Sequence, residues 1–265
     1  MSRLDMILKS YYDRALRRGI GPLGASINLI KEKIFRVNRK ERINSRWGHN
    51  RYDLPLLMSF PRSGLNLIRY FLETVSGQPT PGQIRNVKGT NFIIDRAHYG
   101  FERINRYSKA ILLIRNYKEC LIREHSIETI RSYDILDRFL ADDSINFSAS
   151  TYGRNIRAFD EFDKPKLLLY YEDLITNKAE NLRSISDFLE LSKSKTEEFI
   201  ENLEQHSSKA VSLYKNVNHD SATAGDANKL VYHSNLLNKQ ELQTIDNYYK
   251  TGFADIFNKY LTRYL

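Results

Sequence analysis

Residues 56–69 are Leu56-Leu57-Met58-Ser59-Phe60-Pro61-Arg62-Ser63-Gly64-Leu65-Asn66-Leu67-Ile68-Arg69, a short apolar run, a Pro/Ser/Gly turn and then apolar residues at helical spacing. A strand that turns tightly into a helix presents free backbone N–H groups and the positive end of the helix dipole, which together favour an anion. In this turn Gly64 permits close approach of the anion, Ser63 and Asn66 can donate from their side chains, and Arg62 carries a permanent charge. The alternative is an ordinary strand–helix turn with a surface arginine.

Bare apolar runs recur along the chain, and each is followed by helical periodicity. The runs are 54–60, 110–114 and 167–171, and helices are expected at 65–75, from 118, and at 178–190 and 194–205. Short apolar strands that alternate with helices are typical of a parallel sheet buried on both faces. The sequence therefore predicts an α/β fold with a central parallel sheet flanked by helices, of the P-loop-like nucleotide-binding kind.

The composition narrows the class of protein further. The chain has 265 residues, 41% hydrophobic and 28% charged, which excludes collagen-like, low-complexity and disordered solvating chains. Its apolar runs are far shorter than the ~20 residues of a membrane span. The single cysteine, Cys120, excludes an intrachain disulfide framework and a Cys-rich metal site, and no N-terminal stretch has the order of a signal peptide. We therefore expect a cytoplasmic protein.

The basic charge is concentrated at the N-terminus. Of the net charge of +9, residues 1–50 carry +8, from 12 Lys and Arg against 4 Asp and Glu. Residues 3–18 and 27–35 have the spacing of short amphipathic helices. We expect a basic helical extension, 1–50, and one α/β domain, 51–265. Such an arm can bind an anionic surface or an amphiphilic acceptor, and because it contains no nucleic-acid-binding module we expect no nucleic-acid partner.

The loop at 59–66 departs from the usual nucleoside-triphosphate P-loop, G-x-x-x-x-G-K-[ST]. Ser59 stands at the first Gly position and Leu65-Asn66 replaces the Lys-Ser/Thr pair, so the hydroxyl that would hold Mg²⁺ is missing. The loop instead resembles the 5′-phosphosulfate loop of the cytosolic-type sulfotransferases, S-[YF]-P-[KR]-S-G-T-T. Those enzymes transfer a sulfuryl group from 3′-phosphoadenosine 5′-phosphosulfate (PAPS) to a hydroxyl or amine and need no metal.

Three further segments resemble the same family, in the expected order, so that the similarity covers roughly residues 54–245. Residues 111–119, ILLIRNYKE, resemble its 3′-phosphate strand, which is closed by R-[ND]-P-x-[DE]. Residues 168–174, LLYYEDL, resemble its Y-E-D-L strand end, and residues 204–208, EQHSS, resemble its H-T-S segment. Residues 1–50 have no counterpart in this resemblance.

The resemblance implies roles for individual residues of the donor site. Arg115 would bind the 3′-phosphate, Tyr171 would lie beside the adenine, and the Glu172-Asp173 pair would be mainly structural. The residues expected to bind PAPS or its product 3′-phosphoadenosine 5′-phosphate (PAP) are Arg62, Ser63, Gly64, Leu65, Asn66, Arg115, Arg123, Tyr171, Ser207 and Lys229.

Several of these positions depart from the family pattern. Leu65 and Asn66 replace two threonines, and Arg123 replaces a serine. Residues 225–229 match the R-K-G segment only weakly, which makes Lys229 a candidate for its phosphate contact.

A histidine and an arginine are the expected catalytic residues. His98 ends the stretch Asp95-Arg96-Ala97-His98, in the interval where much of the family has a catalytic histidine, and an imidazole suits removal of a proton from an attacking hydroxyl. Arg62 would stabilise charge on the transferred group. Asp95 is the alternative base, because protein-tyrosine sulfotransferases use a carboxylate. No metal ligand is expected.

Two other functions stay open at this point. A divergent P-loop kinase would use Glu172-Asp173 to hold the magnesium of Mg-ATP, and a non-catalytic protein would use the same fold to bind a nucleotide or a partner. The acceptor of a sulfotransferase would be a hydroxyl-bearing molecule that the sequence does not name. Residues 76–92, 130–155 and 209–235 are expected to line its side of the site.

Overall fold

The computed structural model describes residues 51–82, 84–99, 102–125, 140, 148–214, 230 and 232–265. All of them belong to one compact unit, Gly48–Leu265. The two helices predicted before residue 50 and the candidate Lys229 lie outside the described residues, and the division at residue 50 stays a prediction. In the described part of the chain, none of the helices has the length and apolar character needed to span a membrane.

Four parallel strands form the central sheet, in the order β2-β1-β3-β4. The strands are β1 (Leu56–Ser59), β2 (Asp95–Ala97), β3 (Ala110–Ile114) and β4 (Lys166–Tyr170). Leu56 of β1 is in register with Asp95 on one side and with Ala110 on the other, and Ala110 is in turn in register with Lys166 of β4. The predicted α/β fold with a parallel sheet flanked by helices is confirmed, and β1 leads directly into a helix through the expected turn.

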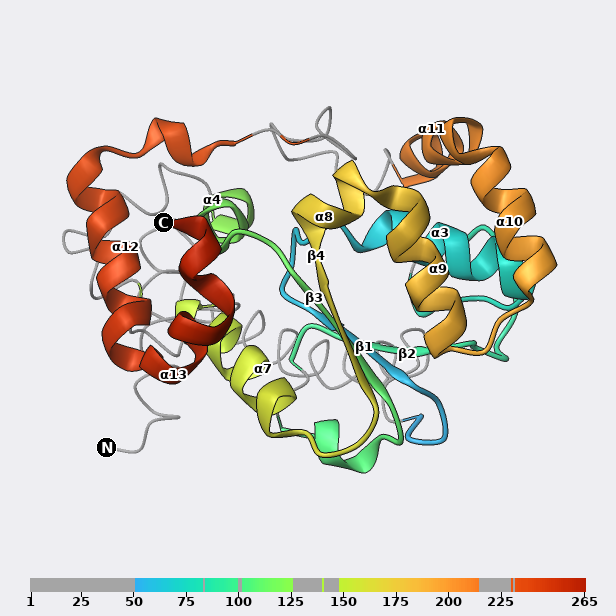
Figure 1. Cartoon of the computed structure of the whole chain (residues 1–265), viewed down its shortest axis with the longest axis horizontal. Coiled ribbons are helices and arrows are strands. Elements are labelled where there is room, and N and C mark those ends of the chain that lie inside the picture. The colour runs from blue at the N-terminus through green and yellow to red at the C-terminus, as the bar shows by residue number, and fades with distance from the viewer. Residues whose placement is uncertain are drawn as a thin grey trace, which may run out of the picture. The chain divides into compact units, whose positions relative to one another are not determined.

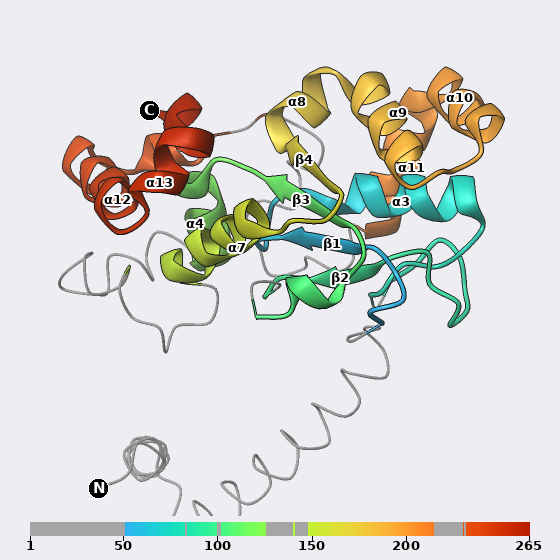
Figure 2. The same cartoon turned by 60° about the horizontal axis from the view of Figure 1, so that its bottom comes forward.

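Helices cover both faces of this sheet (Figures 1 and 2). On one side lie α3 (Leu65–Ser76), α8 (Tyr171–Thr176), α9 (Lys178–Phe188), α10 (Lys193–Glu201) and α11 (Leu203–Tyr214). On the other lie α4 (Tyr117–His125), α7 (Ala149–Glu161), α12 (Lys239–Gly252) and α13 (Ala254–Ile256). Short helical turns occupy Ile104–Arg106, Ser234–Leu236, Phe257–Leu261 and Thr262–Tyr264.

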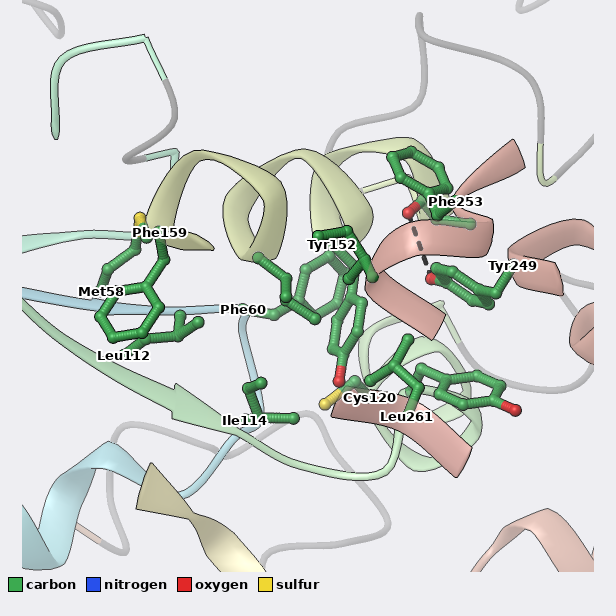
Figure 3. Close-up of a cluster of buried hydrophobic side chains, with 14 of the residues drawn as sticks. Met58, Phe60, Leu112, Ile114, Cys120, Tyr152, Phe159, Tyr249, Phe253 and Leu261 are labelled. Atoms are coloured by element: carbon green, nitrogen blue, oxygen red, sulfur yellow. Dashed lines mark hydrogen bonds between the residues drawn. The ribbon is translucent and has the colours of Figure 1, made fainter. Parts of the chain in front are cut away.

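The side chains of β1, β3 and β4 alternate between two hydrophobic cores. Leu56 and Met58 belong to the core under α7 and the C-terminal helices, which Figure 3 shows in part, whereas Leu57 belongs to the core under α3. Successive side chains of a strand point to opposite faces, so a strand with a core on each side must be apolar at every position. This requirement explains the bare apolar runs of the sequence.

Three element boundaries differ from the sequence-based expectation. The helix expected at 194–205 is two helices, α10 and α11, because the chain turns at Asn202. The strand expected at 167–171 ends at Tyr170, and Tyr171 is already the first residue of α8. The helix expected at 178–190 ends at Phe188. The sheet also has a strand that is not among the expected apolar runs, β2, which begins at Asp95 and pairs with β1.

A buried ion pair on α3 anchors the loop that follows this helix. Glu73, which is fully buried, accepts hydrogen bonds from the backbone N–H groups of Thr80 and Val87, at 3.0 and 3.1 Å, and also from that of Asn86. Arg69, one turn earlier, donates from Nε to Thr80 Oγ1 at 2.9 Å and lies 4.0 Å from the Glu73 carboxylate. The two side chains therefore hold the loop at 78–87 against α3.

We expect Glu73→Gln to lower the free energy of unfolding by about 3–5 kcal/mol, because it leaves Arg69 without its buried countercharge and turns an amide N–H₂ toward backbone donors. Urea unfolding measures the change. Glu201→Gln, on an exposed side chain at the end of α10, is the matched control and should alter stability by less than about 0.5 kcal/mol. Equal effects of the two substitutions would contradict the anchoring role of Glu73.

Candidate functional site

The candidate site lies at the carboxyl edge of the sheet, where all four parallel strands end. The loop at 59–64 follows β1, His98 follows β2, Arg115 follows β3, and Tyr171 follows β4. Ligands of open α/β sheets bind outside the carboxyl ends of the strands. The strand order thus brings together residues from four segments that lie far apart in the sequence.

The loop after β1 has the backbone of an anion-binding turn. Arg62 and Gly64 both have positive φ angles, 65° and 88°, and Gly64 precedes the first residue of α3, Leu65. A positive φ at Arg62 is a strained conformation for a residue with a side chain, and such strain concentrates at ligand-binding sites. The side chain of Leu65 is buried, and that of Asn66 is half-buried.

Tyr171 packs directly against the loop. A Cβ placed on Gly64 would lie 2.2 Å from Cε2 of the Tyr171 ring, so the ring occupies the space that any side chain at position 64 would need. On the Tyr171 ring lies the Arg115 guanidinium, with its Cζ 4.1 Å from the ring centroid. Arg115 also donates from a terminal nitrogen to the carbonyl of Arg62 at 2.9 Å. The residues predicted from three separate motifs therefore form one continuous contact.

Below this contact lies the only cysteine of the chain. The Cys120 thiol is 3.5 Å from Ser63 Oγ and donates to the carbonyl of Arg115 at 3.8 Å. Burial raises the pKa of Cys120 to about 12, against the opposing effect of Arg115, so the thiol stays protonated and unreactive. Cys120 and Ser63 thus join the turn after β1 to the end of β3.

His98 is held at both ring nitrogens. Nε2 lies 3.1 Å from the Arg96 guanidinium, and Nδ1 lies 2.9 Å from the carbonyl of Ser59. A guanidinium can only donate, so we assign Nε2 as the acceptor and Nδ1 as the protonated nitrogen. In this tautomer the imidazole is neutral, and the lone pair that could take a proton is on Nε2.

Asp95, the alternative base, lies at the opposite end of β2 from His98. It is in register with Leu56 at the start of β1, and its carboxylate accepts hydrogen bonds from the Tyr107 hydroxyl at 2.6 Å and the Arg51 N–H at 3.2 Å. Three residues of extended strand separate Asp95 from His98, roughly 10 Å. Of the two candidates, the one at the carboxyl edge is His98.

Arg123 and Arg62, the other two arginines that are predicted to bind the donor, each lie beside a carboxylate. Arg123 Nε lies 3.3 Å from the buried carboxylate of Glu119, which also accepts from the Ser234 N–H at 2.6 Å. Burial would raise the pKa of Glu119, but the hydrogen bonds from His233 and Ser234 and the charge of Arg123 lower it overall. Arg62 Nε lies 3.4 Å from Glu124 in the same helix, α4. A phosphate contact of Arg123 stays a prediction.

The acidic pair that follows Tyr171 makes structural bonds. Glu172 accepts from the Asn116 N–H at 3.1 Å and from the Tyr264 hydroxyl at 2.8 Å. Asp173 accepts two hydrogen bonds from Arg263, at 2.7 and 2.9 Å, and these lower the pKa of Asp173. Both carboxylates are thus engaged in holding the ends of β3, β4 and the chain together. Among the described residues, no group of three or more His, Cys, Asp or Glu could hold a metal ion.

Ser207 lies on α11, which packs against α3, and not in a loop. Its hydroxyl is buried, and among the described residues it has no hydrogen-bond partner. Buried polar groups of native proteins are nearly always paired, so such a hydroxyl is a candidate ligand contact. The contacts of the described residues do not join Ser207 to Arg115 or Tyr171.

Two residues of the site carry no signal in the sequence. Tyr152 and Asn155, both on α7, donate hydrogen bonds to the carbonyls of Arg115 and His98 at 2.7 and 2.8 Å. They belong to no motif, and each partner is distant in the sequence. Only the three-residue spacing of two buried polar side chains on one helix could have indicated them.

Comparisons with known proteins give distant likenesses. No protein-family model matches the chain, and no curated protein matches it. Among solved structures, mouse sulfotransferase SULT7A1 complexed with PAP is similar with a TM-score of 0.49 and 18% identity, over 84% of this chain and 90% of that one. The sulfotransferase domain of the olefin synthase from Synechococcus PCC 7002 is similar with a TM-score of 0.41 and 14% identity, over 74% of this chain and 94% of that one. Likenesses at this level identify neither donor nor acceptor.

The two glycines that flank α3 test the packing of Tyr171. Gly77 has a φ of 71° and open space around its Cα, so Gly77→Ala should lower stability by the backbone strain alone, about 1–2 kcal/mol. Gly64→Ala adds overlap with the Tyr171 ring and should lower stability by a further ~1–3 kcal/mol. Urea unfolding measures both. In a Tyr171→Ala background the effect of Gly64→Ala should fall to that of Gly77→Ala; an unchanged effect would mean that Tyr171 does not pack on the loop.

Proposed function

We propose that this protein is a PAPS-dependent sulfotransferase that transfers a sulfuryl group to a hydroxyl or amine of its acceptor without a metal ion. The observation that carries the proposal is the contact of Arg115 with Tyr171 and of Tyr171 with Gly64. It joins the three segments that resemble the donor-binding motifs of that family, at the edge of the sheet where nucleotides bind.

On the donor side, this chain's residues would bind a nucleotide with a negatively charged group at each end, the 3′-phosphate and the 5′-phosphosulfate. Arg62 and the backbone N–H groups at the start of α3 would hold the sulfonate and the leaving phosphate. The guanidinium of Arg115, which lies on the Tyr171 ring, would hold the 3′-phosphate by a charge-assisted hydrogen bond. A contact of Tyr171 with the adenine stays a prediction from the sequence. Charge stabilisation by fixed donors is the main requirement of transfers of this type.

On the acceptor side, His98 would act as the general base. Its Nε2 would exchange the hydrogen bond from Arg96 for one from the acceptor hydroxyl. It would then take the hydroxyl proton while the acceptor oxygen bonds to sulfur and the bond from sulfur to the leaving phosphate oxygen breaks. The Nδ1–H hydrogen bond to Ser59 would keep the ring in the required tautomer and stabilise the imidazolium that forms. The new negative charge on the phosphate would be held by the loop and Arg62.

The kinase alternative gains no support from the site, since the Glu172 and Asp173 carboxylates are bound to Asn116, Tyr264 and Arg263. A non-catalytic nucleotide-binding protein on this fold remains the contrasting outcome of the experiments below. The acceptor, a cytoplasmic location and a role of the basic arm, 1–50, toward anionic or amphiphilic molecules stay predictions from the sequence.

We expect PAP to stabilise the protein against thermal unfolding without added metal, by about 2.7 kcal/mol at a hundred times its dissociation constant.

Arg115→Ala should weaken PAP binding by ~1.5–3 kcal/mol, because it removes a hydrogen bond to a charged group. Isothermal titration gives the affinities. Arg183→Ala, which removes an exposed guanidinium paired with Glu197, is the control and should bind PAP like the parent protein. Stabilisation by Mg-ATP and not by PAP would replace this proposal with the kinase.

We expect His98→Ala to lower the rate of transfer from labelled PAPS by roughly 10²–10⁴-fold, the usual contribution of a general base, while the affinity for PAP stays unchanged. The assay screens phenol, sugar, lipid and peptide acceptors. Asp95→Asn should retain transfer per folded molecule, since Asp95 lies at the other end of β2. Full activity of His98→Ala would remove His98 as the base, and PAP binding without transfer to any acceptor class would favour the non-catalytic protein.

A further inference from the structure

Helix α7 is the only described helix that donates side-chain hydrogen bonds to the backbone after two different strands of the site. Its residues Tyr152 and Asn155 are three positions apart and therefore lie on the same helix face. Both are buried, Asn155 to 1% exposure and Tyr152 to 2%. Their partners are main-chain carbonyls, so these side chains restrain where the backbone lies.

Tyr152 restrains the end of β3. Its hydroxyl donates to the carbonyl of Arg115 at 2.7 Å, and its ring packs edge-on against Phe60 with centroids 5.4 Å apart. Figure 3 shows the side chain reaching from α7 toward Cys120, between the ends of β1 and β3. Burial raises the pKa of Tyr152 far above its ordinary value, so the hydroxyl remains a donor at any physiological pH.

Asn155 restrains the end of β2. Its side-chain amide donates to the carbonyl of His98 at 2.8 Å. The imidazole of His98 is held separately, through Nδ1 and the carbonyl of Ser59. The backbone and the ring of His98 are thus tied to two elements, α7 and the end of β1, which leaves the residue little freedom to move relative to the loop.

The helix itself is braced on its outer side. A Cβ on Gly153 would lie 2.5 Å from the Phe253 ring, so α7 packs closely against the segment that joins α12 to α13. The Tyr249 hydroxyl donates to the carbonyl of Ala149 at 3.1 Å, and Arg157 pairs with Asp255 at 2.7 Å. A shift of α7 along the sheet would have to move the C-terminal helices with it.

We propose that α7 sets the separation between the base and the 3′-phosphate clamp, with Asn155 as the positioning residue for His98 and Tyr152 as the positioning residue for Arg115. The inference rests on the proposed function. Transfer between two bound molecules requires their reacting atoms within about 3–3.5 Å, and a misplacement of about 1 Å can lower the rate by 10²-fold. One helix that holds both sides of the site meets that requirement, and it assigns a different kinetic role to each residue.

The test compares Tyr152→Phe and Asn155→Leu with Glu161→Gln, a control at an exposed residue at the end of the same helix. Tyr152→Phe should raise the Kd of PAP and the KM of PAPS roughly tenfold with little change in kcat. Asn155→Leu should lower kcat roughly tenfold or more and leave the Kd of PAP within about twofold, because only the base is displaced. Asn155→Ser replaces Asn155→Leu if the leucine variant does not fold.

The inference would be overturned if both variants matched Glu161→Gln in kcat and in Kd. It would also be overturned if both variants lost kcat and PAP affinity to the same extent. Hydrogen exchange separates this outcome from failure of the proposed function. If the parent protein neither binds PAP nor transfers sulfuryl groups, the proposed sulfotransferase function is refuted. Faster exchange of the amides around Asn116 in Tyr152→Phe, and around His98 in Asn155→Leu, would then still support the restraint by α7. Exchange equal to that of Glu161→Gln would refute it.

Discussion

The packing of Tyr171 between the backbone of Gly64 and the guanidinium of Arg115 is the contact on which the candidate site depends. It requires β1, β3 and β4 to end side by side, because each supplies one of its members. It also requires a glycine with positive φ in the loop, since any side chain there would overlap the tyrosine ring. A guanidinium stacked on an aromatic ring away from water is attracted by up to about 2 kcal/mol, so the stack holds Arg115 in place without neutralising its charge.

Two helices on opposite faces of the sheet extend this arrangement. On one face, α3 begins at the loop and, through Arg69 and Glu73, also holds the chain at 78–87, a segment that we expect on the acceptor side. On the other face, α7 ties the backbone of His98 and of Arg115 to the same rigid element. The loop, the proposed base His98 and the proposed phosphate clamp Arg115 are therefore positioned by packed helices, as a site for group transfer requires.

Much of the fold could be predicted because it follows from local rules. The strands β1, β3 and β4 are short apolar runs, and a strand buried on both faces has no other pattern available. β2 is not among the expected apolar strands, since its first residue, Asp95, is charged and is buried through hydrogen bonds from Tyr107 and Arg51 that no local sequence pattern indicates. The sequence predicts one helix over 194–205 because the turn at Asn202 hardly disturbs the helical periodicity.

From its sequence alone, the chain determines the kinds of chemistry available: a turn with Arg62 and Gly64, an arginine that closes β3, and a tyrosine that closes β4. These are local features, set by residue type and by the strand ends that precede them. Tertiary structure decides which of them meet, because contacts among residues 53 to 107 positions apart depend on the order β2-β1-β3-β4. It also decides the roles of Tyr152 and Asn155, which donate hydrogen bonds to the backbone carbonyls of Arg115 and His98. Every residue has a backbone carbonyl, so the sequence does not indicate which carbonyls these side chains bind. Only the packing of α7 against the strand ends determines it.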